Sequence, residues 1–128
     1  MKAFLLVATT LLSLAFAFTA CSDPTCSGNS CVCTDGAACN VGCAAGELCN
    51  VVCPAGQSCG VTCDPGQPCD VQCESSSSCH VDCKGDPDCR VTCPAGNCTV
   101  TNCTEATCTV SCGAGGVATY AGTQATCP

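Results

Sequence analysis

The chain lacks almost every large apolar side chain after its first twenty residues. It contains no tryptophan and no isoleucine, and its three phenylalanines and single methionine all lie within residues 1–20. After that segment only one leucine, Leu48, and one tyrosine, Tyr120, remain. Globular cores are built mainly from such side chains, so a core of ordinary composition is excluded. Valine and cysteine are the only residues abundant enough to fill an interior.

Basic residues are also scarce. Three lysines and arginines stand against ten acidic residues, which gives a formal net charge of −7. Lysine and arginine are needed to neutralise the phosphates of nucleic acid and the headgroups of anionic lipids. We therefore expect no nucleic-acid partner and no electrostatic docking on a membrane. The acidity is interpreted as a contribution to solubility.

The most regular feature of the chain is a ten-residue repeat. A unit C-x-V-x-C recurs with its valine at positions 41, 51, 61, 71, 81 and 91, and less regularly through Val100 and Val110. In an extended strand this alternation places both cysteines and the valine on one face. The five residues between units, such as PAGQS at 54–58, are rich in glycine, proline, aspartate and serine. Such residues reverse the chain.

The spacing of the cysteines restricts their pairing. Two cysteines four residues apart in a strand are separated by about 13 Å, whereas a disulfide needs Cα atoms within about 7 Å. A reversal between units instead brings the flanking cysteines together, so each turn is expected to be closed by a bridge. The ten expected pairs are Cys26–Cys31, Cys33–Cys39, Cys43–Cys49, Cys53–Cys59, Cys63–Cys69, Cys73–Cys79, Cys83–Cys89, Cys93–Cys98, Cys103–Cys108 and Cys112–Cys127.

The repeat predicts an all-β, small disulfide-rich protein in which each unit contacts only its neighbours. Residues 31–112 are predicted to form a narrow β-solenoid of about ten-residue units, with a β-meander of disulfide-pinned hairpins as the alternative. The solenoid is favoured because it buries the cysteine and valine face within itself. A coil filled by disulfides resembles, in architecture only, the disulfide-braced β-helical antifreeze proteins of insects. Residues 113–128 are rich in glycine, alanine and threonine and predict a C-terminal cap or tail.

The N-terminus has the features of an export signal. Lys2 precedes an apolar run that ends in small residues before Cys21, so residues 1–20 are predicted to be a signal peptide and residues 21–30 a tether. The motif Phe18-Thr19-Ala20-Cys21 resembles the lipobox of bacterial lipoproteins, although Phe18 replaces the usual leucine. The resemblance implies acylation of Cys21 and anchoring at the outer membrane, because Ser22 and not aspartate follows. Acylation of Cys21 would also leave twenty of the 21 cysteines, an even number that can all form bridges.

Plain secretion is the alternative for this N-terminus. Cys21 would then carry a free thiol or an intermolecular bridge. Both interpretations place the protein outside the cytoplasm, as outer-membrane-anchored or extracellular, where thiols become disulfides.

The sequence offers little for catalysis or metal binding. There is a single histidine, His80, and no recognisable nucleophile motif, so we expect no enzyme activity, no catalytic residue and no cofactor. His80 alternates with inward residues and is predicted to face solvent without binding a metal. Six acidic residues are interpreted as solvated turn carboxylates, with no calcium motif among them. They are Asp64, Asp70, Glu74, Asp82, Asp86 and Asp88.

These observations favour a non-enzymatic structural or interaction protein of the cell surface, whose protein or surface partner the sequence does not name. Two alternatives remain open. Metallothioneins share the density of cysteine and the scarcity of aromatic residues, which implies thiolate metal storage, but their repeated C-x-C spacing occurs here only at Cys31-Val32-Cys33. A secreted defence or toxin-like protein is the other alternative.

Overall fold

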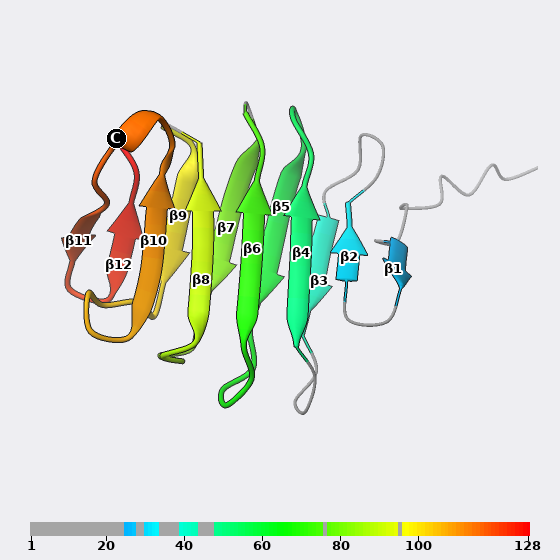
Figure 1. Ribbon diagram of the computed structural model, residues 1–128, viewed down its shortest axis with the longest axis horizontal. Coiled ribbons are helices and arrows are strands. Elements are labelled where there is room, and N and C mark those ends of the chain that lie inside the picture. Colours follow the sequence, from blue (N-terminus) through cyan, green and yellow to red (C-terminus); the bar gives the residue numbers. More distant parts are fainter. Residues whose placement is uncertain (1–24, 28–29, 34–38, 44–47, 76, 95) are drawn as a thin grey trace, which may run out of the picture.

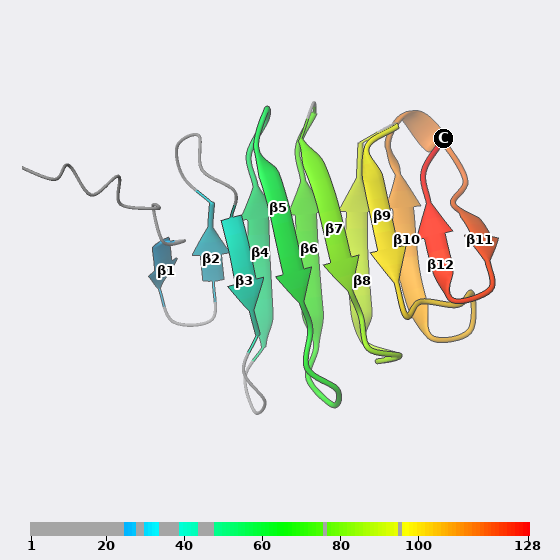
Figure 2. The same ribbon diagram turned by 180° about the vertical axis from the view of Figure 1, so that it is seen from behind.

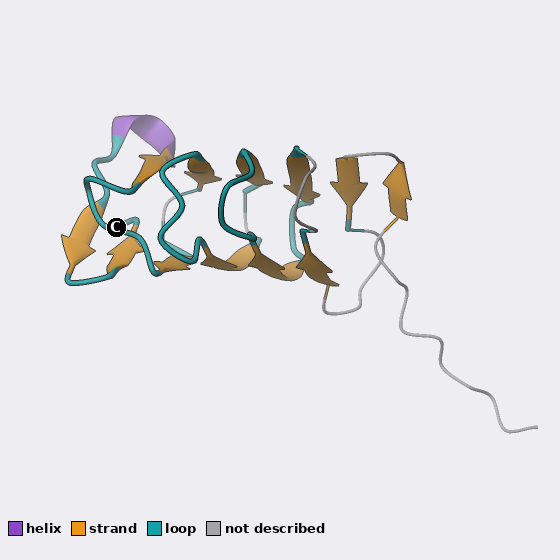
Figure 3. Ribbon diagram, turned by 90° about the horizontal axis from the view of Figure 1, so that it is seen from below, coloured by secondary structure: helices purple, strands orange, loops and turns teal. Residues whose placement is uncertain are grey.

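The chain forms a β-solenoid made of two facing sheets, in a computed structural model that describes residues 25–27, 30–33, 39–43, 48–75, 77–94 and 96–128. The predicted signal peptide and Cys21 lie outside these residues. Figures 1 and 2 show the two sheets from opposite sides, and Figure 3 shows the space between them from below. Within the described part of the chain, each sheet contains six strands.

The strands alternate between the two sheets along the chain. Sheet A contains, in spatial order, β1 (Thr25–Ser27), β2 (Ser30–Val32), β4 (Cys49–Cys53), β6 (Cys69–Cys73), β8 (Cys89–Cys93) and β10 (Cys108–Cys112). Sheet B contains β11 (Thr119–Ala121), β12 (Gln124–Thr126), β9 (Cys98–Thr101), β7 (Ser78–Asp82), β5 (Ser58–Thr62) and β3 (Cys39–Gly42). A short 3-10 helix, η1, spans Gly113–Gly115.

Strands of the repeat pair in parallel with the strand two units away, not with the next one. In sheet A, for example, Val51 lies opposite Val71, and Val71 lies opposite Val91. One coil therefore uses two ten-residue units, and the turn between units moves the chain from one sheet to the other. This topology confirms the predicted solenoid and excludes the β-meander, in which consecutive strands would pair with each other.

The inward face of each strand carries the residues predicted for it. In β4, Cys49, Val51 and Cys53 are buried, while Asn50 and Val52 point outward. The valines form one column under each sheet. The sheet A column is Cys31, Val51, Val71, Val91 and Val110, and the sheet B column is Val41, Val61, Val81, Val100 and Ala125. No member of either column is more than 9% exposed.

Several turns between units need backbone conformations that glycine supplies. Gly56 and Gly66 adopt φ values of 77° and 85°, which lie in the left-handed region. A side chain there would be strained, so glycine at these positions allows the tight reversal. The reversal places the cysteine that ends one strand next to the cysteine that begins the following strand.

Two antiparallel hairpins stand at the ends of the solenoid. The β1 strand pairs with β2 and extends sheet A, so part of the segment expected to be a tether is a strand. At the other end β12 pairs with β9, and β11 pairs with β12, which extends sheet B (Figure 1). Ala125 of β12 lies opposite Val100 and is fully buried. Residues 113–128 therefore include a hairpin that covers the last coil of sheet B.

Candidate functional site

Disulfides join the two sheets at nearly every turn of the described chain. Bridges that follow a sheet A strand, termed A-to-B bridges, are Cys33–Cys39, Cys53–Cys59, Cys73–Cys79 and Cys93–Cys98. Bridges that follow a sheet B strand, termed B-to-A bridges, are Cys43–Cys49, Cys63–Cys69, Cys83–Cys89 and Cys103–Cys108. Cys112–Cys127 joins β10 to the chain after β12. The cysteines of the A-to-B and B-to-A bridges are at most 8% exposed.

The structure thus brings together nine of the ten cysteine pairs expected from spacing. The tenth, Cys26–Cys31, involves a side chain outside the described residues, although the backbones of these two cysteines lie opposite each other in the β1–β2 pair. Cys21 is also outside the described residues, so its acylation stays a prediction.

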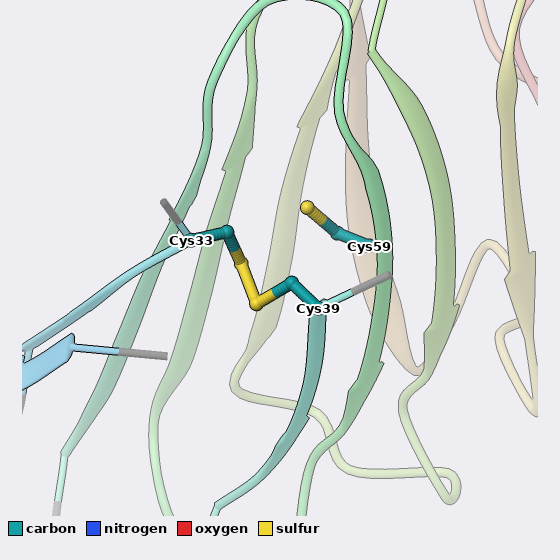
Figure 4. A group of neighbouring side chains, drawn as sticks. All are labelled: Cys33, Cys39 and Cys59. Carbon is teal, nitrogen blue, oxygen red and sulfur yellow. A yellow bond between two sulfur atoms is a disulfide. The ribbon is translucent and has the colours of Figure 1, made fainter. Parts of the chain in front are cut away.

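Neighbouring bridges of one edge approach each other closely. The Sγ atoms of Cys43 and Cys69 are 3.9 Å apart, although each belongs to a different disulfide. Cys63 and Cys89 show the same 3.9 Å separation one coil further on. On the opposite edge, Figure 4 shows the Cys59 sulfur beside the Cys33–Cys39 bridge, and the three sulfurs lie within 4.8 Å of one another. The sulfurs of the three bridges from Cys43–Cys49 to Cys83–Cys89 therefore form a continuous sulfur column, and the first two A-to-B bridges make one similar contact.

No protein-family model, no curated protein and no solved structure matches the chain. The functional interpretation therefore depends on the geometry of this chain. Among its described residues, no helix has the length and apolar character needed to span a membrane.

These sulfur contacts have the spacing of a metal site but not its chemistry in the oxidised state. Among the described residues, three sulfur triplets each lie within 4.8 Å, which is close enough for one soft metal ion. Cysteine binds metals as a thiolate, and a sulfur in a disulfide has no such charge. In the oxidised protein the sulfurs therefore act as apolar filling and as covalent links between the sheets.

A buried carboxylate links two successive coils at the turn edge. The Asp86 side chain is only 2% exposed, and it accepts hydrogen bonds from the backbone N–H groups of Gly66 and Gln67, about one coil earlier in the chain. It also accepts a 2.9 Å bond from the Asp88 N–H within its own turn. The bond from Asp88, followed by those from the earlier turn, lowers the pKa of Asp86 against the opposing effect of burial.

The interpretation of all six acidic residues as solvated was wrong for Asp86. The carboxylate is buried because the Gly66 turn, twenty residues earlier, presents backbone N–H groups that need an acceptor. Glu74 makes a similar link on the other edge, where it accepts a 3.2 Å bond from the Ala55 N–H. Ser77, which is fully buried, donates a 2.6 Å bond to the Glu74 carbonyl.

Substitution of Asp86 by asparagine is expected to destabilise the oxidised protein by about 1–3 kcal/mol at neutral pH. The amide retains one acceptor oxygen but turns its NH2 group towards backbone N–H groups. Asp88→Asn changes an exposed carboxylate in the same turn and is expected to have little effect. Guanidinium unfolding with the disulfides intact measures both, and equal effects of the two variants would contradict the assignment.

The stability difference between the wild type and Asp86→Asn is also expected to depend on pH. Because the pKa of Asp86 is lowered by folding, its contribution is complete above the unfolded-state value of about 3.9 and disappears as the pH falls further. The stability difference between the wild type and Asp86→Asn is therefore expected to shrink below about pH 4. A difference that stays constant down to about pH 2 would argue against a depressed pKa.

Two further contacts between coils, at Asp82 and Lys84, lie nearer the surface. Asp82 accepts a 2.8 Å bond from the Asn102 side chain and a 3.0 Å bond from the Lys84 N–H. The bond from Asn102 is the main cause of the lowered pKa of Asp82. Lys84 forms a 3.1 Å ion pair with Asp64, exposed on both sides. Pairs of this kind contribute less than about 1 kcal/mol.

His80 lies on the outer face of sheet B, exposed as predicted. It lines a shallow groove of mixed polarity across β3, β5 and β7 together with Asn40, Thr62 and Asp82. Gly42 and Gly60 are outward positions in this groove; the space beside Gly42 is open, whereas the Asn40 side chain lies over Gly60.

Proposed function

We propose that the protein is an exported, non-enzymatic scaffold that displays a rigid surface outside the cytoplasm. The observation that carries this proposal is the stack of buried disulfides joining the two sheets. Disulfides persist in oxidising compartments, whereas the cytosol keeps cysteine thiols reduced. The structure thus supplies stiffness and resistance to unfolding, while the outward side chains are free to vary.

The outer faces of the sheets support recognition of a specific partner better than binding to a repeating lattice. In sheet A the outward positions change from Asn50 and Val52 to Asp70 and Gln72, and then to Arg90 and Thr92. A lattice partner would need the same side chain at each coil. A protein or surface partner that recognises one particular set of residues fits this variation.

The lipobox-like motif supports attachment to the outer membrane through lipid on Cys21, with free secretion as the alternative. A short lipid-linked segment would then connect the scaffold to the bilayer. Because residues 1–24 lie outside the described part of the chain, this proposal has its support in the sequence alone.

Intact mass before and after reduction tests the export proposal directly. The protein is expressed in a Gram-negative host and purified separately from membranes and from medium. We expect a membrane-extracted form that carries acyl chains on Cys21 and gains two hydrogens for each of ten bridges on reduction. Cys21→Ser is the matched control and is expected to lose the acyl mass and leave the membrane fraction. Non-acylated wild type found only in the medium would favour free secretion.

Thiolate metal storage is a second candidate, because the sulfur triplets within 4.8 Å would suit a soft metal ion once reduced. The same mass measurement separates the two functions. Protein isolated with free thiols and a stoichiometric metal would support storage, and fully bridged protein without metal would exclude it. A cationic defence role is disfavoured by the net charge of −7.

A further inference from the structure

We propose that the B-to-A bridges form a thiol–disulfide relay, in which reduction of the first bridge is passed inward from coil to coil. The relay comprises Cys43–Cys49, Cys63–Cys69 and Cys83–Cys89. This inference is independent of lipid anchoring and of the outer-face partner. It depends on the distances between sulfurs of different bridges, which are 3.9 Å at both junctions.

Reduction begins at the most accessible bridge of the relay. Cys43 and Cys49 are 7% and 8% exposed, whereas Cys63, Cys69, Cys83 and Cys89 are at most 2% exposed. An external dithiol reduces Cys43–Cys49 to two thiols and is itself oxidised to a disulfide. Loss of a proton then gives a thiolate on Cys43, which is the nucleophile for exchange.

The first exchange crosses from one coil to the next. The Cys43 thiolate attacks the Cys69 sulfur, the Cys43–Cys69 bond forms, and the bond from Cys69 to Cys63 breaks. Cys63 leaves with the electron pair as a thiolate. The attacking sulfur has to close a gap of 3.9 Å to the bond length of about 2.05 Å, a movement that side-chain rotation can supply.

The second exchange repeats the step one coil further on. The Cys63 thiolate attacks the Cys89 sulfur over the second 3.9 Å gap, and Cys83 leaves as a thiolate that takes up the proton. One disulfide has been reduced in total, and the two thiols end at Cys49 and Cys83. The new bridges connect successive coils, whereas the original bridges connect the two sheets within a coil.

Confinement keeps the exchange specific. The sulfurs of the inner bridges are screened from solvent, and the nearest foreign sulfur to Cys43 within the relay belongs to Cys69. An internal thiolate held beside a disulfide has a high effective concentration relative to dissolved thiols. Exchange along the column is therefore expected to be faster than exchange between molecules.

Limiting reduction followed by peptide mapping tests the relay. The oxidised protein is treated with a substoichiometric amount of the phosphine TCEP at about pH 4, where thiolates are scarce. One half is kept at this pH and the other is raised to about pH 8.5 before thiols are trapped with N-ethylmaleimide and the protein is digested with pepsin. The crossed products expected in the second half are peptides linked through Cys43–Cys69 and Cys63–Cys89, with label on Cys49 and Cys83.

The acid half is the internal reference. There the label is expected on both members of the reduced bridge, with at least tenfold less crossed peptide, because exchange requires the thiolate. Labels that stay on Cys43 and Cys49 at the higher pH would overturn the relay. Crossed peptides scattered over unrelated cysteines would also overturn it, because they would indicate random scrambling.

A pair of double variants locates the path. Cys63→Ser with Cys69→Ser removes the middle bridge and is expected to keep the label on Cys43 and Cys49. The matched control, Cys73→Ser with Cys79→Ser, removes one A-to-B bridge and is expected to leave the migration to Cys83 intact. Migration to Cys83 in the first variant would contradict the path. The wild-type measurement decides the proposal even where a variant fails to fold.

Discussion

Complete reduction and alkylation of the cysteines is expected to unfold the protein at neutral pH. Apart from Ala125, the buried apolar side chains of the described residues are valine and cystine, and no described aromatic or leucine side chain lies fully buried to replace them. In the chain-entropy model, each short disulfide-closed loop stabilises the folded state by about 2 kcal/mol, because the bridge restricts the unfolded chain. Reduction removes this contribution at every bridge. Reduction also breaks the covalent links between the sheets, so the facing columns can separate.

Circular dichroism and amide hydrogen exchange measure this outcome. The expected result is loss of the β-sheet signal and of protection in the central strands β4–β9. The control is oxidised protein exposed to the same alkylating reagent, which should keep both. Protected amides in the fully reduced and alkylated chain would show that valine packing and backbone hydrogen bonds suffice without the bridges.

Substitution of Val91 by aspartate is expected to destabilise the oxidised protein by more than about 4 kcal/mol. Val91 is 1% exposed and lies between Val71 and Val110 in the sheet A column. A carboxylate there would be buried among methyl groups and disulfide sulfurs, without a hydrogen-bond donor from a side chain of the column. It would therefore interrupt the column at a central coil.

Thr92→Asp is the matched control, because it introduces the same side chain one residue further along β8. Thr92 points outward and is exposed, so the expected change is within about 0.5 kcal/mol. Guanidinium unfolding of both variants with the disulfides intact gives the comparison. Similar destabilisation by the two substitutions would contradict the assignment of inward and outward faces.

The sequence predicted the faces of the strands and the closing of the turns, but not the size of the coil. The alternation of cysteine and valine determines which side chains point inward, and the spacing of Cys53 and Cys59 allows a bridge across a turn. Neither fact determines whether the next strand returns to the same sheet or crosses to the other. Both arrangements present the same inward face, so the two-unit coil became visible only in the register of Val51 with Val71.

The contacts between coils were less accessible to sequence reasoning. Asp86 and its donors at Gly66 and Gln67 are about twenty residues apart, a separation that has meaning only once the coil length is known. The same is true of the close approach of Cys43 to Cys69. A ten-residue period suggests the wrong neighbour for each of these residues. With the two-unit coil in hand, the positions opposite one another can be read along the printed sequence.

Because each ten-residue unit is only half a coil, the number of units that can be added by duplication is restricted. Insertion of a single unit before β9 would transfer every later strand to the opposite sheet. The β11–β12 hairpin, which now pairs with β9 in sheet B, would then have to extend sheet A instead. Two inserted units would lengthen the molecule by one complete coil and leave both ends in place. Gains and losses of even numbers of units are therefore compatible with the architecture, whereas odd numbers require a new ending.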